Sequence, residues 1–377
     1  MMAYIRKTQQ AIIGKKPVKG FPVILSDEFE VYWLSLNYLL EKSRSNSLSS
    51  VRTYSQHLCD FFSQLEIDEI PISSEFMTED YLLAYKSSVI DRDGSGKENT
   101  ENYASQIIRT VIDYFMWLES EKFTNNLIGE SSQYRIRIKR TNRGFKHPLT
   151  RALRRNRIAL SAPRTGWIQV VKNFGPKNER ASKRFQLMID WGKTAGLRAF
   201  EACNLKVIQM PERDAVQNAI ADGKKMYIRL TVTKGRQPKV IPVPPLLIKH
   251  TWDYIDIERA ELIQSFHKKA RSKYELYNEP KEVFLSEKTG RAISSVAFSN
   301  SIRKAFLEAV EAGELSASER VWCHGLRHNF SVTLLKGLDK EGVPRPEAVG
   351  RQATRHGSEE AMEPYLSERF NDEFSDE

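Results

Sequence analysis

The chain has 377 residues, of which 40% are hydrophobic and 28% are charged. This composition is typical of a packed protein, and the length indicates two or three domains. No apolar run reaches the roughly 20 residues that a membrane-spanning helix needs, and the three cysteines are too dispersed for a disulfide framework or a paired-cysteine zinc site. These features exclude a disulfide-stapled secreted domain and a membrane protein, so we expect a cytoplasmic location.

The positive charge is concentrated in one central segment. The net charge is +10, yet positions 131–178 alone contain thirteen Lys or Arg residues and no acidic residue. A single-sign run of this length repels itself unless a polyanion neutralises it, which favours nucleic acid as the partner. A solvated face and an anionic membrane are the alternatives, but the run has no amphipathic helical stripe with bulky aromatic residues.

The N-terminal part of the chain is expected to be helical. Residues 1–26 are basic and free of acids, and form either a DNA-contacting arm or a frayed terminus. In residues 27–130, apolar side chains recur at helical spacing in four stretches, 29–40, 51–65, 82–89 and 103–118, which predicts a helical DNA-binding domain. The serines at 47–50 are typical of a helix N-cap.

The basic segment at 131–160 has little helical period, and we interpret it as an extended linker between two domains. Its side chains are the expected DNA contacts: Arg135, Arg137, Lys139, Arg140, Arg143, Lys146, Arg151, Arg154, Arg155 and Arg157.

Residues 161–377 are predicted to form a second domain that is mainly α with a small β-hairpin, an α+β fold. Helices are expected at 180–194, 246–272, 295–311, 324–336 and 346–352, and a last short one from Ser358. A hairpin is expected from strands at 226–232 and 239–243, with the turn at 234–238. The chain then ends in a short acidic tail.

Two motifs in this second domain bring polar residues to helix edges. The run T-A-G-L-R-A-F-E at 194–201 places Arg198 just after a glycine turn, with Glu201 one turn further along the same face. The run H-G-L-R-H at 324–328 places His324 and Arg327 on one face of another helix. Taken singly, each of these residues would more often be structural or a surface ion-pair partner.

Three further residues complete an ordered set. Lys234 is in the hairpin turn, and Tyr365 follows His356 by nine residues. The set resembles the tyrosine recombinase (phage integrase) family, in which an Arg in a T-G-L-R-x-x-E context is followed by a hairpin Lys, an H-x-x-R motif, a His or Trp, and a nucleophilic Tyr nine residues later. The matching positions here are Arg198, Lys234, His324, Arg327, His356 and Tyr365.

The resemblance implies a helical core-binding domain and a catalytic domain that form a clamp on double-stranded DNA. It also implies cleavage through a covalent 3′-phosphotyrosine at Tyr365, without metal, ATP or another cofactor. Arg198 and Arg327 would hold the phosphate oxygens, His324 and His356 would donate hydrogen bonds or move protons, and Lys234 would protonate the leaving 5′-oxygen. Glu201 would orient Arg198 or a neighbouring His. Four protomers, monomeric when free, would assemble on two DNA sites and cut one strand pair at a time through a Holliday junction.

Some residues depart from the family pattern or compete for its roles. Gly325 stands where the family usually has Asp, and Thr354-Arg355 where it usually has Leu-Gly. Pro364 directly precedes Tyr365 and predicts a kinked or mobile helix. Lys239, across the turn, is an alternative to Lys234 as the acid, and we assign His328 a structural role.

Other functions remain open at this stage. A non-catalytic DNA-binding accessory factor or repressor explains the basic segment but not the ordered set, and a topoisomerase would use the same phosphotyrosine chemistry. The R-H-G tripeptide at 355–357 also marks histidine phosphatases, but too few residues follow it for their α/β domain. A metal-dependent nuclease is disfavoured because no carboxylate cluster accompanies these motifs. No motif identifies the target DNA. No motif distinguishes integration from excision, resolution or transposition.

Overall fold

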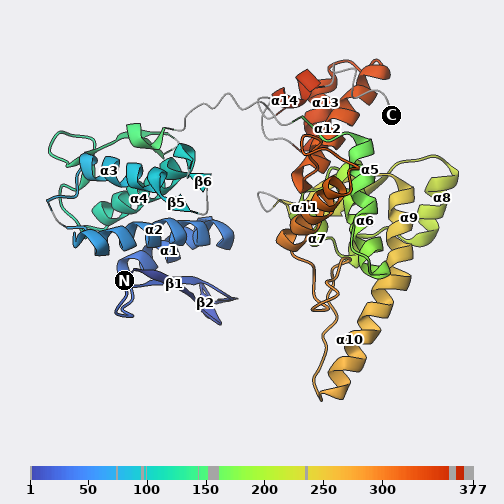
Figure 1. Ribbon diagram of the computed structural model, residues 1–377, viewed down its shortest axis with the longest axis horizontal. Helices are drawn as coiled ribbons and strands as arrows, with labels where there is room; N and C mark the ends of the chain where they lie inside the picture. Colours follow the sequence, from blue (N-terminus) through green and yellow to red (C-terminus); the bar gives the residue numbers. More distant parts are fainter. Residues whose placement is uncertain are drawn as a thin grey trace. The chain divides into compact units, whose positions relative to one another are not determined.

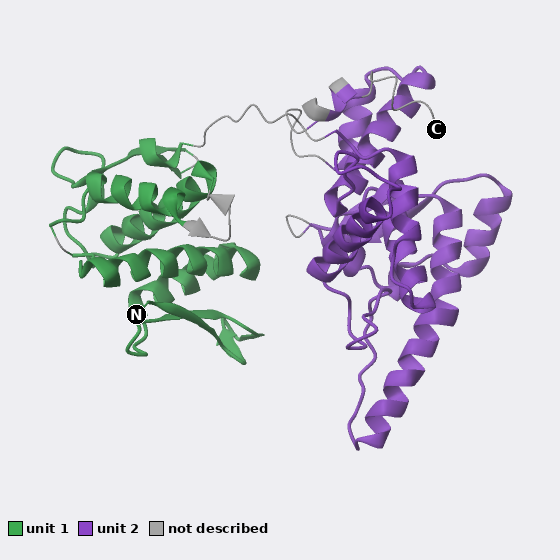
Figure 2. Cartoon of the chain, viewed as in Figure 1, with its two compact units in different colours: residues 1–156 green, residues 157–377 purple. Residues whose placement is uncertain are grey.

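The computed structural model describes residues 2–73, 75–94, 97–98, 100–142, 144–151, 161–233, 237–355 and 362–368. The chain is mainly helical and divides into two compact units, residues 1–156 and residues 157–377 (Figures 1 and 2). Each unit has its own hydrophobic core. Within the described ranges, no helix combines the length and the apolar character needed to cross a bilayer.

The N-terminal unit contains the four helices that the apolar spacing predicts. They are α1 (Trp33–Ser45), α2 (Leu48–Asp68), α3 (Glu79–Asp91) and α4 (Glu101–Ser120). The Ser47 hydroxyl accepts the Ser50 N–H at 3.1 Å and caps α2, as the serine stretch predicts. Thr78 and Thr100 cap α3 and α4 in the same way.

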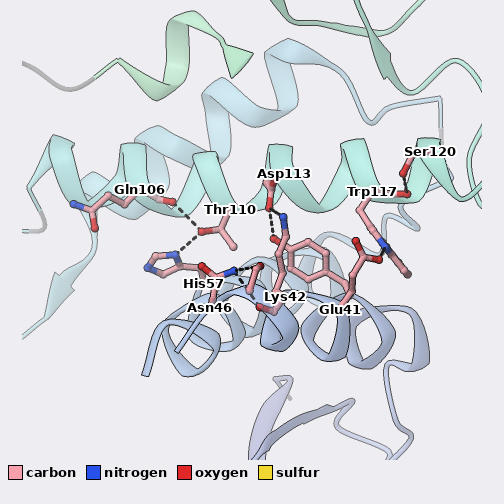
Figure 3. A network of polar contacts seen from close by, with 11 residues as sticks. Glu41, Lys42, Asn46, His57, Gln106, Thr110, Asp113, Trp117 and Ser120 are labelled. Carbon is pink, nitrogen blue, oxygen red and sulfur yellow. Dashed lines mark hydrogen bonds and ion pairs between the residues drawn. The ribbon is translucent and has the colours of Figure 1, made fainter. Parts of the chain in front are cut away.

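Polar contacts as well as apolar packing fix these helices around α4 (Figure 3). Asp113 of α4 accepts the Tyr38 hydroxyl at 2.6 Å and pairs with Lys42 at 2.6 Å, so it ties α1 to α4. The His57 ring on α2 shares a 2.8 Å hydrogen bond with Thr110. Burial lowers the pKa of His57, so this contact is made by a neutral ring.

The first 25 residues pack onto the N-terminal unit. Strand β1 (Tyr4–Lys7) pairs antiparallel with β4 (Pro22–Leu25), and β2 (Ala11–Ile13) with β3 (Lys16–Val18). Phe21 and Ile24 are buried in the core, and Arg52 of α2 donates to the Gly20 carbonyl at 2.9 Å. The frayed-terminus alternative is therefore wrong.

The predicted linker is also wrong over most of its length. Strand β7 (Ile128–Gly129) pairs in parallel with β8 (Ile136–Arg137), and β9 (Lys139–Thr141) pairs antiparallel with β10 (Gly144–Lys146) before a 3₁₀ turn, η1 (Pro148–Thr150). Ile136 and Ile138 are buried in the core, and the basic residues Arg137 and Lys139 that follow each of them are exposed. Residues 131–151 thus belong to the N-terminal unit, and residues 152–160 lie outside the described part. A short pair, β5 (Asp93–Gly94) and β6 (Lys97–Glu98), precedes α4.

The C-terminal unit is built on α6 (Glu179–Thr194), whose Trp191 is fully buried. Around it lie α5 (Thr165–Asn173), α7 (Ala199–Cys203), η2 (Val207–Gln209), α8 (Arg213–Ala221), α9 (Pro245–Tyr254), the π-helical turn η3 (Ile255–Arg259), α10 (Ala260–Ser272) and α11 (Ser295–Glu311). The predicted hairpin is present as β11 (Met226–Leu230) and β12 (Lys239–Val243), with Ile228 opposite Ile241. The α+β prediction is confirmed.

Three helices at the end of the chain place the candidate site. Helix α12 (Cys323–Lys340) packs against α6, α13 (Pro346–Thr354) and α14 (Glu363–Glu368). Gly192 of α6 allows the close approach, because a Cβ at this position would lie 2.9 Å from the Leu326 side chain. The residues of the T-G-L-R and H-x-x-R motifs are therefore brought to neighbouring elements of one unit.

Candidate active site

The T-G-L-R turn between α6 and α7 holds Arg198 through Glu201. Gly196 has a φ of +61°, and a Cβ there would lie 2.4 Å from the Phe330 ring, so this turn requires glycine. The Glu201 carboxylate accepts the backbone N–H of Arg198 at 2.9 Å and pairs with its Nη1 at 3.2 Å. The predicted shared face is confirmed, and Glu201 positions Arg198.

Arg327 is fully buried on α12. Its Nη1 donates to the Gly196 carbonyl at 2.5 Å, a contact that links the two motifs. Its Nε and Nη2 have no hydrogen-bond partner among the described residues. These two nitrogens lie on one edge of the planar guanidinium, which is the geometry that binds two oxygens of a phosphate or carboxylate.

A third guanidinium, which the sequence analysis did not assign, belongs to the same cluster. The Arg355 side chain is only 8% exposed, and its Nη2 lies 3.0 Å from Oε2 of Glu201 and donates to the Gly196 carbonyl at 2.9 Å. Its Nε and Nη1 are enclosed and have no partner in the described part of the chain. One buried carboxylate and one carbonyl thus hold the side chains of Arg198, Arg327 and Arg355 together.

The cluster carries more positive than negative charge. Burial, followed by the charges of Arg198 and Arg355, lowers the pKa of Arg327 to about 9. Burial also lowers the pKa of Arg355, although Glu201 opposes the shift. Buried cations that repel one another are stabilised when an anion binds between them.

Tyr365 on α14 packs against α12, the helix that carries Arg327. It is 4% exposed and packs among Ala162, Val332, Leu335 and Met362. Burial raises the pKa of its phenol, whereas the charges of Arg327 and Arg198 lower it. Tyr365 therefore lies within electrostatic reach of both predicted guanidiniums.

In the described residues 362–368, Pro364 does not kink a helix. Helix α14 begins at Glu363, so Pro364 occupies its first turn, where the missing N–H would have no helical acceptor. The short helix was predicted to start at Ser358, and residues 356–361 lie outside the described residues.

Two histidines of α12 lie next to each other, and one of them contacts the tyrosine ring. The rings of His324 and His328 are 4.9 Å apart, and the His328 ring lies edge-on to Tyr365 at 5.1 Å, all between centroids. Burial, with His324 and Arg327 nearby, lowers the pKa of His328 to about 4, so this ring is neutral at pH 7. Its spacing of four residues is the sequence signal that places His328 on the same helix face as His324.

Two predicted catalytic residues, Lys234 and His356, lie outside the described residues. The hairpin that carries Lys234 is present, and the Thr233 hydroxyl donates to the Gln237 carbonyl across the base of its turn. Lys239, the alternative acid, is exposed at the start of β12. The described residues contain no group of three or more His, Cys, Asp or Glu side chains placed to share a metal ion.

The predicted DNA contacts are surface residues of the N-terminal unit where they are described. Arg137, Lys139, Arg140, Lys146 and Arg151 are exposed and Arg135 is half-buried, whereas Arg143, Arg154, Arg155 and Arg157 lie outside the described part. Lys139 and Lys146 face each other across the β9–β10 pair. Like charges in this position destabilise a hairpin unless an anion neutralises them.

No protein-family model matches the chain, and no curated protein sequence does so either. Solved structures do share its fold, at low sequence identity. The XerH site-specific recombinase, in a post-cleavage complex with a palindromic difH substrate, is 14% identical and has a TM-score of 0.52, with 89% of this chain and 81% of that chain covered.

Two further structures extend this likeness. A lambda integrase tetramer bound to a Holliday junction is 13% identical with a TM-score of 0.53, and 89% of this chain and 77% of that chain are covered. The Tn1549 transposon integrase, in complex with circular intermediate DNA, is 12% identical with a TM-score of 0.51, and 88% and 94% are covered. The chain therefore has the fold of the tyrosine recombinases and integrases, as the ordered set of motifs predicts.

Proposed function

We propose that this protein is a site-specific DNA recombinase that cuts and rejoins strands through a covalent phosphotyrosine at Tyr365. The observation that carries the proposal is a buried tyrosine that packs against α12 beside His328. The same helix carries Arg327, whose guanidinium has one edge without a partner among the described residues. The likeness to DNA-bound recombinases in fold supports the same class.

The guanidiniums would act on the phosphate. A phosphodiester carries one negative charge, and attack at phosphorus develops a second one on the non-bridging oxygens. The unpaired edge of Arg327 and the side chain of Arg198 would bind these oxygens and stabilise the added charge, in a site that water enters poorly. Because these cations supply the charge stabilisation, the proposed reaction needs no metal ion.

The covalent step exchanges one phosphate ester for another. The phenol oxygen of Tyr365 forms a bond to phosphorus and gives up its proton to a nearby base, for which His324 or His356 is a candidate. The bond from phosphorus to the 5′-oxygen breaks, and Lys234 would supply the proton to this leaving oxygen. A 5′-hydroxyl of a second strand then attacks the phosphotyrosine and releases Tyr365, so no ATP is required.

Binding of DNA would involve both units. In the proposal, the basic residues of 131–151 bind the backbone of the duplex, and the two units form a clamp. The lambda integrase structure is a tetramer bound to a Holliday junction, and we propose a tetramer on two DNA sites for this chain as well.

A covalent-adduct assay tests the proposal without knowledge of the target. Genomic DNA of the source organism, randomly nicked and purified, is incubated with the protein in EDTA, and SDS-stable protein–DNA adducts are captured and sequenced. Nicks trap the intermediate because the short 5′-hydroxyl strand diffuses away. We expect adducts at a recurrent sequence with wild type and none with Tyr365→Phe, which keeps the buried ring but lacks the nucleophile.

The outcomes separate the alternatives. Adducts that persist in Tyr365→Phe, or that disappear in EDTA, would contradict the mechanism. DNA binding without any adduct would indicate an accessory factor or repressor. Adducts accompanied by relaxation of supercoiled plasmid, with no strand exchange between two copies of the recovered site, would indicate a topoisomerase.

A further inference from the structure

Arg355 is outside the six positions of the ordered set, yet it shares Glu201 and the Gly196 carbonyl with the other two arginines. We propose that Arg355 is a positioning residue for strand cleavage, whose guanidinium neutralises Glu201 so that Arg198 and Arg327 keep their full charge for the scissile phosphate. The inference rests on the proposed function and assigns a role to a residue that the family pattern does not include.

The charge balance of the cluster carries the argument. Glu201 is buried and holds Arg198 in place. Its carboxylate would therefore cancel one of the two phosphate-binding guanidiniums. With Arg355 on the same carboxylate at 3.0 Å, three guanidiniums and one carboxylate leave a net charge of +2. This balances the total of two negative charges that the phosphate carries once the phenol has attacked.

The unpaired donors indicate that the described part of the chain does not complete this balance. Nε and Nη1 of Arg355 and Nε and Nη2 of Arg327 are buried and have no acceptor among the described residues. Buried guanidinium N–H groups without acceptors are costly, and such groups are found where a ligand completes the site. The two unpaired nitrogens of Arg355, Nε and Nη1, lie on different edges of its guanidinium and cannot bind two oxygens of one phosphate side by side. Arg327 is therefore better placed to bind the phosphate, and Arg355 is better placed to pair with Glu201.

The backbone at Arg355 makes the inference testable. Arg355 ends α13 with a φ of +61° and a ψ of 39°, a left-handed conformation that favours glycine. Arg355→Gly therefore removes the guanidinium and relaxes the backbone at the same time. A loss of activity in this variant cannot be caused by backbone strain.

The first measurement is the rate of adduct formation on a nicked duplex that carries the recovered site, at saturating DNA. We expect Arg355→Gly and Arg355→Gln to be slower than wild type by about tenfold to a hundredfold, the range for loss of one charged hydrogen-bonding group. DNA affinity should change little, because the second negative charge on the phosphate is present in the transition state and not in the bound substrate. Arg355→Lys keeps the charge and should recover part of the rate.

The double variant Glu201→Gln/Arg355→Gln separates charge balance from packing. It removes one negative and one positive charge, so the net charge returns to +2, and the amide carbonyl introduced at position 201 can still accept the Arg198 N–H. We expect it to cleave faster than Arg355→Gln alone. A double variant slower than Arg355→Gln would overturn the inference.

A neutral scissile linkage gives an independent readout. If the duplex carries a methylphosphonate at the cleaved position, one negative charge is absent from the ground state and from the transition state. The ratio of wild-type to Arg355→Gln rates should then shrink toward one. A purely structural role would leave the ratio the same on both substrates.

The matched control is Arg345→Gly, at the other end of α13. Arg345 also has a left-handed backbone, with a φ of +55°, but it is exposed. This variant should cleave like wild type. If wild type forms adducts and Arg355→Gln matches its rate, the inference is overturned and the proposed function stands. If wild type forms no adduct at all, both are overturned.

Discussion

At the scale of single residues, the candidate site depends on titratable groups that are buried in the protein. Three arginines share one carboxylate and one carbonyl, and a neutral histidine lies against the tyrosine ring. Each of these groups costs folding free energy in the absence of a ligand. The stability of the C-terminal unit should therefore respond to pH and to anions more strongly than that of the N-terminal unit.

His328 gives a pH-dependent test of this view. Its pKa is lowered from 6.5 to about 4 in the folded chain, mainly by burial. Between these two values the unfolded chain binds a proton that the folded chain does not bind. The free energy of unfolding should consequently fall as the pH decreases from 6.5 to 4, and should lose nothing more from this residue below that range.

The measurement compares wild type with His328→Asn by calorimetry at several pH values from 7 to 4. Carboxylates contribute equally in both proteins, so the difference between the two curves isolates the histidine. For the unfolding transition of the C-terminal unit, we expect the free energy of unfolding to fall less steeply with decreasing pH in the variant than in wild type. Parallel curves would show that His328 does not resist protonation.

The positions of the candidate site residues were predictable where they follow from a local motif, and not where they follow from tertiary contacts. Arg198, Arg327 and Tyr365 come from motif spacing, and the structure brings them within electrostatic reach of one another. Arg355 depends on a left-handed helix end that turns its side chain toward Glu201, far away in the sequence. The departure from the family pattern at this position was the only local signal.

At the scale of elements, the basic segment shows how charge can hide a strand. Arg135 and Arg137 alternate with Ile136 and Ile138, which are buried in the core. This is the period-two pattern of a half-buried strand. The density of arginines led to the linker interpretation, whereas the four helices of the same unit were predicted because their apolar spacing is long and regular.

The β9–β10 hairpin makes a prediction in which DNA binding and stability change in opposite directions. Lys139 faces Lys146 across the pair, and neither has an ion-pair partner in the described part of the chain. In Lys139→Gln/Lys146→Gln, we expect weaker DNA binding with a slope of log K against log salt reduced by about 2. The same variant should be more stable in low salt, by a few tenths of a kcal/mol.

Filter binding at several salt concentrations and urea unfolding at low salt check the two effects. The control is Lys139→Arg/Lys146→Arg, which keeps both charges and should keep the salt slope. An unchanged slope in the glutamine variant would remove this hairpin from the DNA-binding surface.

At the scale of the whole molecule, the position of the nucleophile decides how an assembly would cleave. Tyr365 packs against Val332 and Leu335 of α12, the helix that carries Arg327 in the same chain. The phenol and the guanidinium proposed to bind the phosphate thus belong to the same chain. We therefore predict cleavage in cis, with no tyrosine donated to a neighbouring protomer.

Mixing two inactive variants tests this prediction. Tyr365→Phe lacks the nucleophile and Arg327→Gln lacks the phosphate fork, so in cis cleavage no protomer of a mixed assembly has a complete site. The mixture should form no more adduct than the two variants do separately, at any ratio. A control measures adduct formation by wild type mixed with increasing amounts of Tyr365→Phe, and a change in adduct per wild-type protomer shows that mixed assemblies form. Recovery of adduct in the mixture of the two variants would mean that Tyr365 leaves its place on α12 and acts on the phosphate held by another protomer.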